Sequence, residues 1–145
     1  MPTTELRSNV NRISSAFLLA PAAFMVVASL LPISLARSET ESASAVLVAT
    51  TAALVLFFIS QRYSRKMLLS EDVKSFIKNL IDGLILSTIL IPLLGLFAAA
   101  YSTQPGAFLS YLPFVVVSYS SAGTMLKMAS DKIDEIEKEK KITQI

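Results

Sequence analysis

Three residue types that carry much of protein chemistry are missing from this chain, which has no cysteine, no histidine and no tryptophan. Without cysteine the chain has no disulfide, iron–sulfur ligand or zinc thiolate, and without histidine it has no imidazole ligand for haem or copper. The missing cysteine also removes the usual indicator of redox compartment. The missing tryptophan leaves interfacial anchoring to tyrosine and phenylalanine. We therefore expect no metal and no cofactor.

Charge is scarce and unevenly placed. Charged residues make up 17% of the 145 residues and hydrophobic residues 53%, and the mean hydropathy is +0.60. A soluble domain is roughly 45–50% apolar even with glycine counted, so this chain is too apolar for that class. The net charge of +2 includes no basic run that resembles a nucleic-acid footprint. We expect a single-domain membrane protein that binds no nucleic acid.

Four segments are nearly free of charge over the length of a membrane crossing. A helix needs roughly 20 residues, at about 1.5 Å rise each, to span a ~30 Å hydrocarbon core. The sequence predicts spans at about 13–36, 42–60, 83–102 and 107–128. Short polar connections within the first and second pairs predict two antiparallel hairpins. The predicted fold class is all-α, with residues 1–145 forming one four-helix transmembrane domain.

The first apolar run has a competing interpretation as a secretory signal peptide. Arg7 and Arg12 precede it, and Ser34-Leu35-Ala36 resembles a small-x-small cleavage site. The apolar core of a signal peptide is only ~7–15 residues long, which is shorter than this run. We expect an uncleaved helix that is loosened at Pro21 and Pro32, because proline removes a backbone donor.

Positive charge alternates along the chain. Twelve of the thirteen lysines and arginines lie in the N-terminus, the middle connection and the tail. The first connection holds one, Arg37, and the third connection holds none. Because positive residues are retained on the cytoplasmic side, we expect a multi-pass protein with both termini in the cytoplasm.

Small side chains recur every four residues in the second and third predicted spans. They are Ala45, Ala49 and Ala53 in the second span, and Gly83, Ser87, Gly95 and Ala99 in the third. Lipid offers no hydrophobic drive between helices, so small residues favour association by allowing close packing. These positions are predicted helix-packing faces, although alanine is also simply common in membrane helices.

A charged, amphipathic stretch at residues 70–82 leads into the third span. It is predicted to be a helix near the headgroup layer, either continuous with the span or bent at Gly83. It ends at Asp82, and a carboxylate at membrane depth is a candidate proton or cation site. Lys78 and Lys74 precede Asp82 at one-turn intervals, however. We expect an interfacial ion pair among these three residues.

The middle connection is the most basic part of the chain. Arg62, Arg65 and Lys66 follow the second span directly. Each cation near an anionic membrane surface contributes about 1 kcal/mol of attraction. We predict contacts between these residues and anionic lipid headgroups, which is compatible with their role in setting topology.

The fourth span is the most polar, with hydroxyl groups clustered over residues 118–124. Such a patch is open to two interpretations, the lining of a pore or polar site and hydrogen bonding between helices. The absence of a nearby charge or amide favours the second. Serine catalysis needs a base, and the titratable groups nearby are Lys127 and Asp82. We expect no enzyme activity.

The tail, residues 129–145, is predicted to be a charged helix. Its acidic residues at 134 and 137 are followed four residues later by lysines, in the order that favours helical ion pairs. Its apolar stripe is too short for a coiled coil. We expect a solvated extension of the fourth span rather than a dedicated docking helix.

Three functions are compatible with this pattern. The first is a non-catalytic subunit that packs within a larger membrane protein complex, with other membrane subunits and anionic lipids as partners. The second is a homo-oligomeric channel, holin-like permeabiliser or small transporter with the fourth-span hydroxyls facing the lumen. The third is a membrane anchor whose C-terminal helix recruits a soluble partner. The absence of charge deep in any span favours the first.

Overall fold

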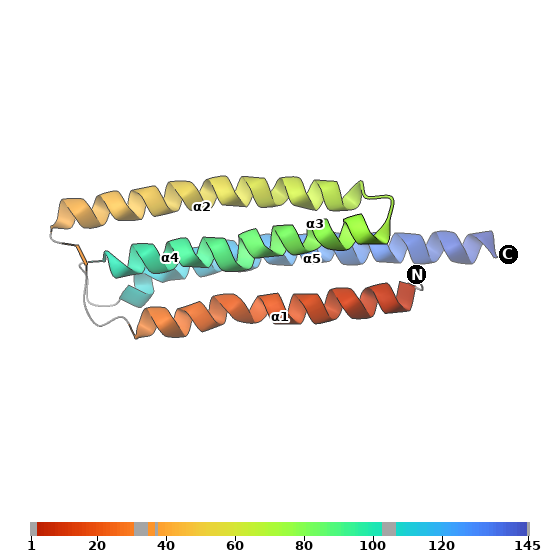
Figure 1. Cartoon of the computed structure of the whole chain (residues 1–145), viewed down its shortest axis with the longest axis horizontal. Helices are drawn as coiled ribbons and strands as arrows, with labels where there is room; N and C mark the ends of the chain where they lie inside the picture. The colour runs from red at the N-terminus through yellow and green to blue at the C-terminus, as the bar shows by residue number, and fades with distance from the viewer. Residues whose placement is uncertain (1–2, 31–34, 37, 103–106, 145) are drawn as a thin grey trace.

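Four long helical rods lie lengthwise beside one another (Figure 1). The computed structural model describes residues 3–30, 35–36, 38–102 and 107–144. Within these ranges four helices are long and apolar enough to cross a membrane, and there is no strand. The predicted all-helical, multi-pass class is therefore confirmed.

The third rod is built from three consecutive elements. The elements in chain order are α1 (Thr3–Ser29), α2 (Glu39–Leu68), α3 (Val73–Ile85), η1 (Leu86–Leu90), α4 (Ile91–Ala100) and α5 (Ala107–Thr143). η1 is a single π-helical turn, and α3, η1 and α4 follow one another without a break. The amphipathic stretch before the third span thus forms the first part of this rod, and it runs alongside α2 (Figure 1).

The first helix ends earlier than the sequence predicts, at Ser29 rather than near Ala36. Proline disfavours helical conformation in the residue before it, so the sequence approaching Pro32 favours a helix end. Further along, the Leu35 N–H donates a 2.8 Å hydrogen bond to the Ala100 carbonyl oxygen, which ties the connection to the end of α4. The predicted loosening at Pro32 itself falls outside the described residues.

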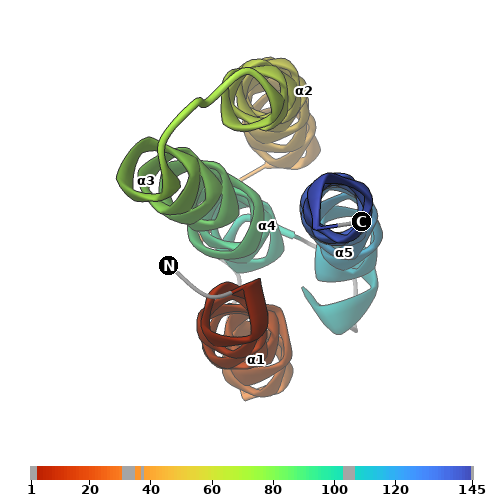
Figure 2. The same cartoon turned by 90° about the vertical axis from the view of Figure 1, so that its right-hand side faces the viewer.

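The third rod occupies the centre of the bundle, where it contacts α1, α2 and α5 (Figure 2). α1 and α2 lie on opposite sides of it, and no pair of their Cα atoms comes within 8 Å. The sequence predicts an antiparallel hairpin here, and the two helices do run antiparallel (Figure 1), but their backbones are not packed against each other in the described structure. The early end of α1 lengthens the connection to residues 30–38, which gives the chain enough reach to cross the bundle.

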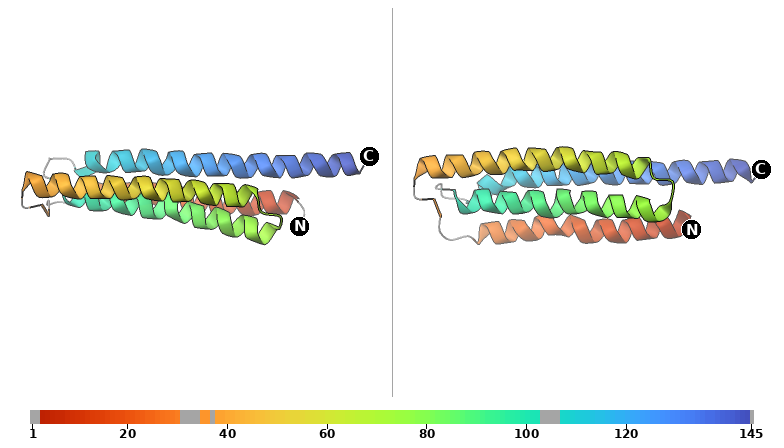
Figure 3. Two further views of the ribbon diagram at one scale, coloured as in Figure 1. Left: turned by 90° about the horizontal axis from the view of Figure 1, so that it is seen from above. Right: turned by 45° about the horizontal axis from the view of Figure 1, so that its top comes forward.

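The N-terminus, the α2–α3 connection and the C-terminus lie at the same end of the molecule (Figure 3). We call this the basic end, because twelve of the thirteen lysines and arginines belong to the segments that meet there. α5 extends beyond the other helices at this end (Figure 3).

Apolar packing continues at the basic end beyond the predicted spans. Leu6, Val10, Phe76, Leu80 and Ile133 are buried in one cluster, although all five precede or follow the predicted membrane boundaries. The apolar side of α3 therefore faces its neighbouring helices. The bundle continues past the apolar spans as a packed helical extension.

Candidate functional site

Three buried serine hydroxyls join three of the four rods. Ser60 on α2, Ser87 in η1 and Ser121 on α5 have Oγ atoms 2.8 to 3.0 Å apart, and all three side chains are fully buried. Each hydroxyl can donate to one neighbour and accept from the other, so the ring satisfies itself. We call this cluster the serine triangle.

The π turn that carries Ser87 has a local cause in Pro92. The Ile91 N–H bonds to the Leu86 carbonyl oxygen, five residues back. The same spacing would pair the Ser87 carbonyl with Pro92, which has no N–H. That carbonyl instead accepts a 2.5 Å hydrogen bond from the Ser118 hydroxyl of α5. A side chain from another helix thus completes the irregular turn.

α5 also bonds to backbone carbonyls of α1 around the proline inside that helix. Pro21 lies inside the helix, is buried, and supplies no N–H to the helical ladder. Two α5 tyrosines donate 3.0 Å hydrogen bonds to carbonyl oxygens in this region, Tyr119 to Leu18 and Tyr111 to Pro21. Prolines are tolerated in membrane helices when neighbouring side chains supply such partners. α5 thus donates side-chain hydrogen bonds to backbone carbonyls of both α1 and the third rod.

The hydroxyl patch predicted at residues 118–124 divides between two faces of α5. Ser118 and Ser121 are buried and bonded within the bundle, whereas Ser120 and Thr124 are exposed. In the described part of the chain, no buried side-chain nitrogen or oxygen lacks a hydrogen-bond partner. The buried hydroxyls therefore hold helices together and offer no unpaired group to a ligand.

The predicted small faces lie against this chain's own helices. Gly83, Ser87, Gly95 and Ala99 are all buried, as are Ala49 and Ala53, while Ala45 is half-buried. A Cβ on Gly95 would stand 2.7 Å from the Phe114 Cβ and from Tyr111 Cδ2. A Cβ on Gly83 would stand 2.0 Å from the Met125 Cε. Close packing at these positions is already complete within one chain.

The ion pair predicted among Lys74, Lys78 and Asp82 is not formed. Both lysines are exposed and Asp82 is half-buried, and no nitrogen–oxygen distance of 4.0 Å or less joins them in the described structure. An exposed ion pair gains roughly 0–1 kcal/mol and must restrain two flexible side chains, so the correct spacing alone does not produce it.

Asp134 and Glu137 of the tail contact α1 rather than the lysines four residues further on. The Arg7 Nη2 hydrogen-bonds to the Asp134 carboxylate and lies 3.4 Å from Glu137 Oε2. These contacts attach α5 to the start of α1 at the basic end. Sequence reasoning missed them, because they join opposite ends of the chain; Arg7 and Asp134 are 127 positions apart.

The three cations predicted to contact lipid headgroups are exposed on the last turns of α2. They are Arg62, Arg65 and Lys66. The Lys66 Nζ lies 5.2 Å from the centre of the Tyr63 ring, within cation–π range. Neither arginine has a carboxylate partner in the described structure. Their contact with lipid stays a prediction.

Neither metal-site geometry nor similarity assigns a function. No group of three or more Cys, His, Asp or Glu side chains within the described ranges is placed to hold a metal ion. No protein-family model, curated protein or solved structure matches the chain. The function must therefore be argued from the surfaces that the fold leaves open.

Proposed function

We propose that this protein is a non-catalytic subunit that packs within a larger membrane protein complex. The observation that carries the proposal is the face of α5 turned away from the bundle. Ser120, Gly123 and Thr124 are exposed there, inside the predicted fourth span. No heavy atom beyond the backbone of its own helix lies within 4 Å of the place where a Gly123 Cβ would stand. We call these three residues the α5 outer face.

The α5 outer face differs from the other surfaces turned to lipid. α1 and α2 present large apolar side chains, such as Leu19, Leu47 and Phe58, which are 67–71% exposed. Small and hydroxyl-bearing residues fill lipid poorly but allow another helix to approach closely. The small faces predicted on α2 and the third rod are already packed, whereas the α5 outer face is open to another helix. A membrane helix of an unlike chain suits it.

A photo-crosslinker in place of Gly123 tests the proposal. p-Benzoylphenylalanine at this position has open space and should give a discrete adduct with an unlike membrane protein. The matched control carries the same group in place of Phe58, which is 67% exposed on α2 and should give no such adduct. Absence of any protein adduct from position 123 in native membranes would refute the subunit role.

A homo-oligomeric channel or transporter is the alternative. The interior of one bundle is packed and its hydroxyls are paired, so a lumen would have to lie between copies, with Ser120 and Thr124 lining it. Adducts of the chain with itself from position 123 would favour this alternative. Solute flux through vesicles that contain only this protein would do the same.

The length of α5 favours a third role, a membrane anchor. α5 is one helix of 37 residues, and residues 138–144 are exposed beyond the bundle. This end could present a charged helix to a soluble partner. Truncation after Glu137 keeps the Arg7 contacts and removes only the exposed end. Unchanged recovery of partners after this truncation would exclude the anchor role.

A further inference from the structure

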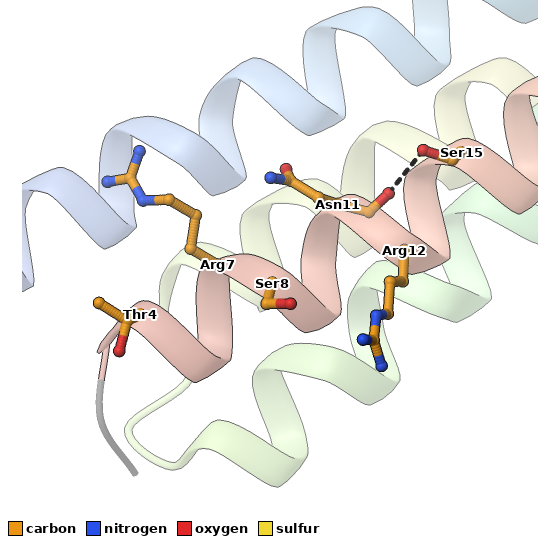
Figure 4. A pocket seen from close by; sticks show the side chains of 6 residues that line it. All are labelled: Thr4, Arg7, Ser8, Asn11, Arg12 and Ser15. Atoms are coloured by element: carbon orange, nitrogen blue, oxygen red, sulfur yellow. Dashed lines mark hydrogen bonds between the residues drawn. The ribbon is translucent and has the colours of Figure 1, made fainter.

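An open hollow of about 610 Å³ lies along α1 at the basic end (Figure 4). Its lining consists of Thr4, Arg7, Ser8, Asn11, Arg12 and Ser15. Arg7 is directed toward α5 and Arg12 away from it, with Ser8 between them (Figure 4). Short polar side chains thus form the floor, and the two guanidinium groups stand at its sides.

The hollow gathers hydrogen-bond donors that the protein does not use. The side chains of Thr4, Ser8 and Asn11 are exposed and make no hydrogen bond in the described structure. Both carboxylate contacts of Arg7 involve Nη2, so its Nε and Nη1 donors carry no partner. Arg12 is exposed and has no carboxylate oxygen within 4.0 Å among the described residues, so its charge is uncompensated.

The position of the hollow indicates which class of ligand these unused donors would contact. Arg12 is the last charged residue before the apolar part of α1, which begins at Ile13. Further along α1, within its apolar part, the Leu19 side chain is 71% exposed, as expected for contact with acyl chains. The hollow therefore stands at the level of the lipid headgroups. A phosphate ester offers the negative charge and the acceptor oxygens that these donors require.

We propose that the α1 hollow binds the phosphate headgroup of an anionic phospholipid in the leaflet at the basic end. Arg12 pairs with the phosphate, and Ser8 and Asn11 donate hydrogen bonds to its oxygens. The site is separate from the exposed cations of α2. The proposal does not depend on the role of the α5 outer face, and it holds for either orientation in the membrane.

Native mass spectrometry of the full chain released from detergent tests this site. The ligands are phosphatidylglycerol, diacylglycerol with the same acyl chains, and sodium phosphate. We expect one retained phosphatidylglycerol, which Arg12→Gln weakens about fivefold, corresponding to the ~1 kcal/mol contributed by one cation at the surface. Ser8→Trp places a large side chain in the hollow without changing the charge and should remove the adduct. Lys127→Gln, which removes an exposed cation at the end of the fourth predicted span, is the matched control and should weaken binding less than twofold.

Each contrary outcome refutes a defined part of the proposal. Equal loss in the Lys127→Gln and Arg12→Gln variants would show general surface attraction instead of a site. Equal retention of diacylglycerol would remove the role of the phosphate, and saturable binding of sodium phosphate alone would make the free anion the ligand. Asn11→Leu is a second neutral change at an exposed position. Unchanged lipid binding in both neutral variants, with folding verified by circular dichroism, would refute the hollow.

Discussion

The Ser118 hydroxyl on α5 donates a 2.5 Å hydrogen bond to the Ser87 carbonyl oxygen in η1. Pro92 removes the N–H that the π spacing would direct to this carbonyl, and hydrocarbon offers no water in its place. The geometry of the third rod thus depends on a residue of a different helix. The same hydrogen bond sets the register between that rod and α5.

Replacing Ser118 by alanine should leave the Ser87 carbonyl without a partner. We expect the free energy of unfolding to fall by about 1–2 kcal/mol, within the range for interhelical hydrogen bonds in membranes and for unsatisfied buried groups. Unfolding in mixed micelles of increasing dodecyl sulfate content measures the change. Ser120→Ala, on the exposed face of the same helix, is the control, and equal stability of the two variants would contradict the role given to Ser118.

The glycines of the membrane-spanning helices should differ sharply in their tolerance of alanine. Gly95→Ala should destabilise the protein most, since its Cβ would meet the Phe114 Cβ, which cannot move without its helix. Gly83→Ala should cost less, because the atoms in its way belong to the flexible end of Met125. Gly123→Ala should stabilise the isolated chain by up to about 1 kcal/mol through helix propensity. Thermal unfolding in detergent measures the order of stability of the three variants. A different order would contradict the packing of these glycines.

The contacts of Arg7 with Asp134 and Glu137 should hold the C-terminal part of α5 against the bundle. In the Arg7→Gln variant we expect faster amide hydrogen exchange over residues 134–143, while the spans stay unchanged. High salt should reproduce part of the effect in the unaltered protein, since these side chains are partly exposed. Arg65→Gln removes an exposed arginine without an ion pair and should have no such effect. Exchange rates that are the same in both variants would argue against the attachment.

The absence of cysteine makes the topology directly testable. Single replacements Ser8→Cys and Gln144→Cys should react with a membrane-impermeant maleimide from one side, and Glu39→Cys from the other. The charge distribution predicts that the first two face the cytoplasm. Labelling of positions 8 and 144 from opposite sides would contradict the arrangement of helices.

The number and class of the helices could be predicted from hydropathy alone. The spacing of the small residues in the third predicted span also carried a signal of the π turn. An α-helix turns about 100° per residue, so the steps of four from Gly83 to Ala99 should drift by about 160° in total. Both residues are nevertheless buried, as are Ser87 and Gly95 between them. A π turn takes in one extra residue and so recovers about 100° of this drift. A four-residue repeat of small side chains with a proline inside it therefore indicates an irregular turn.

Other features could not be predicted because they depend on distant parts of the chain. The partner of Asp134 is Arg7 rather than the lysine one turn away, and only the packing of α1 beside α5 determines this. Ser60, at the end of the second predicted span, has no local feature that marks it for the serine triangle. The separation of α1 from α2 follows from where α1 ends, which hydropathy places several residues too late.

The placement of α1 and α2 also determines the order in which the protein can assemble. These are the first helices to leave the ribosome, yet every helix that either one contacts is synthesised after both. The carbonyl groups near Pro21 and the hydroxyl of Ser60 receive their α5 partners only when the last span has entered the bilayer. A nascent chain that stops before α5 can pack α1 and α2 against the third rod but lacks these hydrogen bonds, so folding is complete only after α5 has been synthesised.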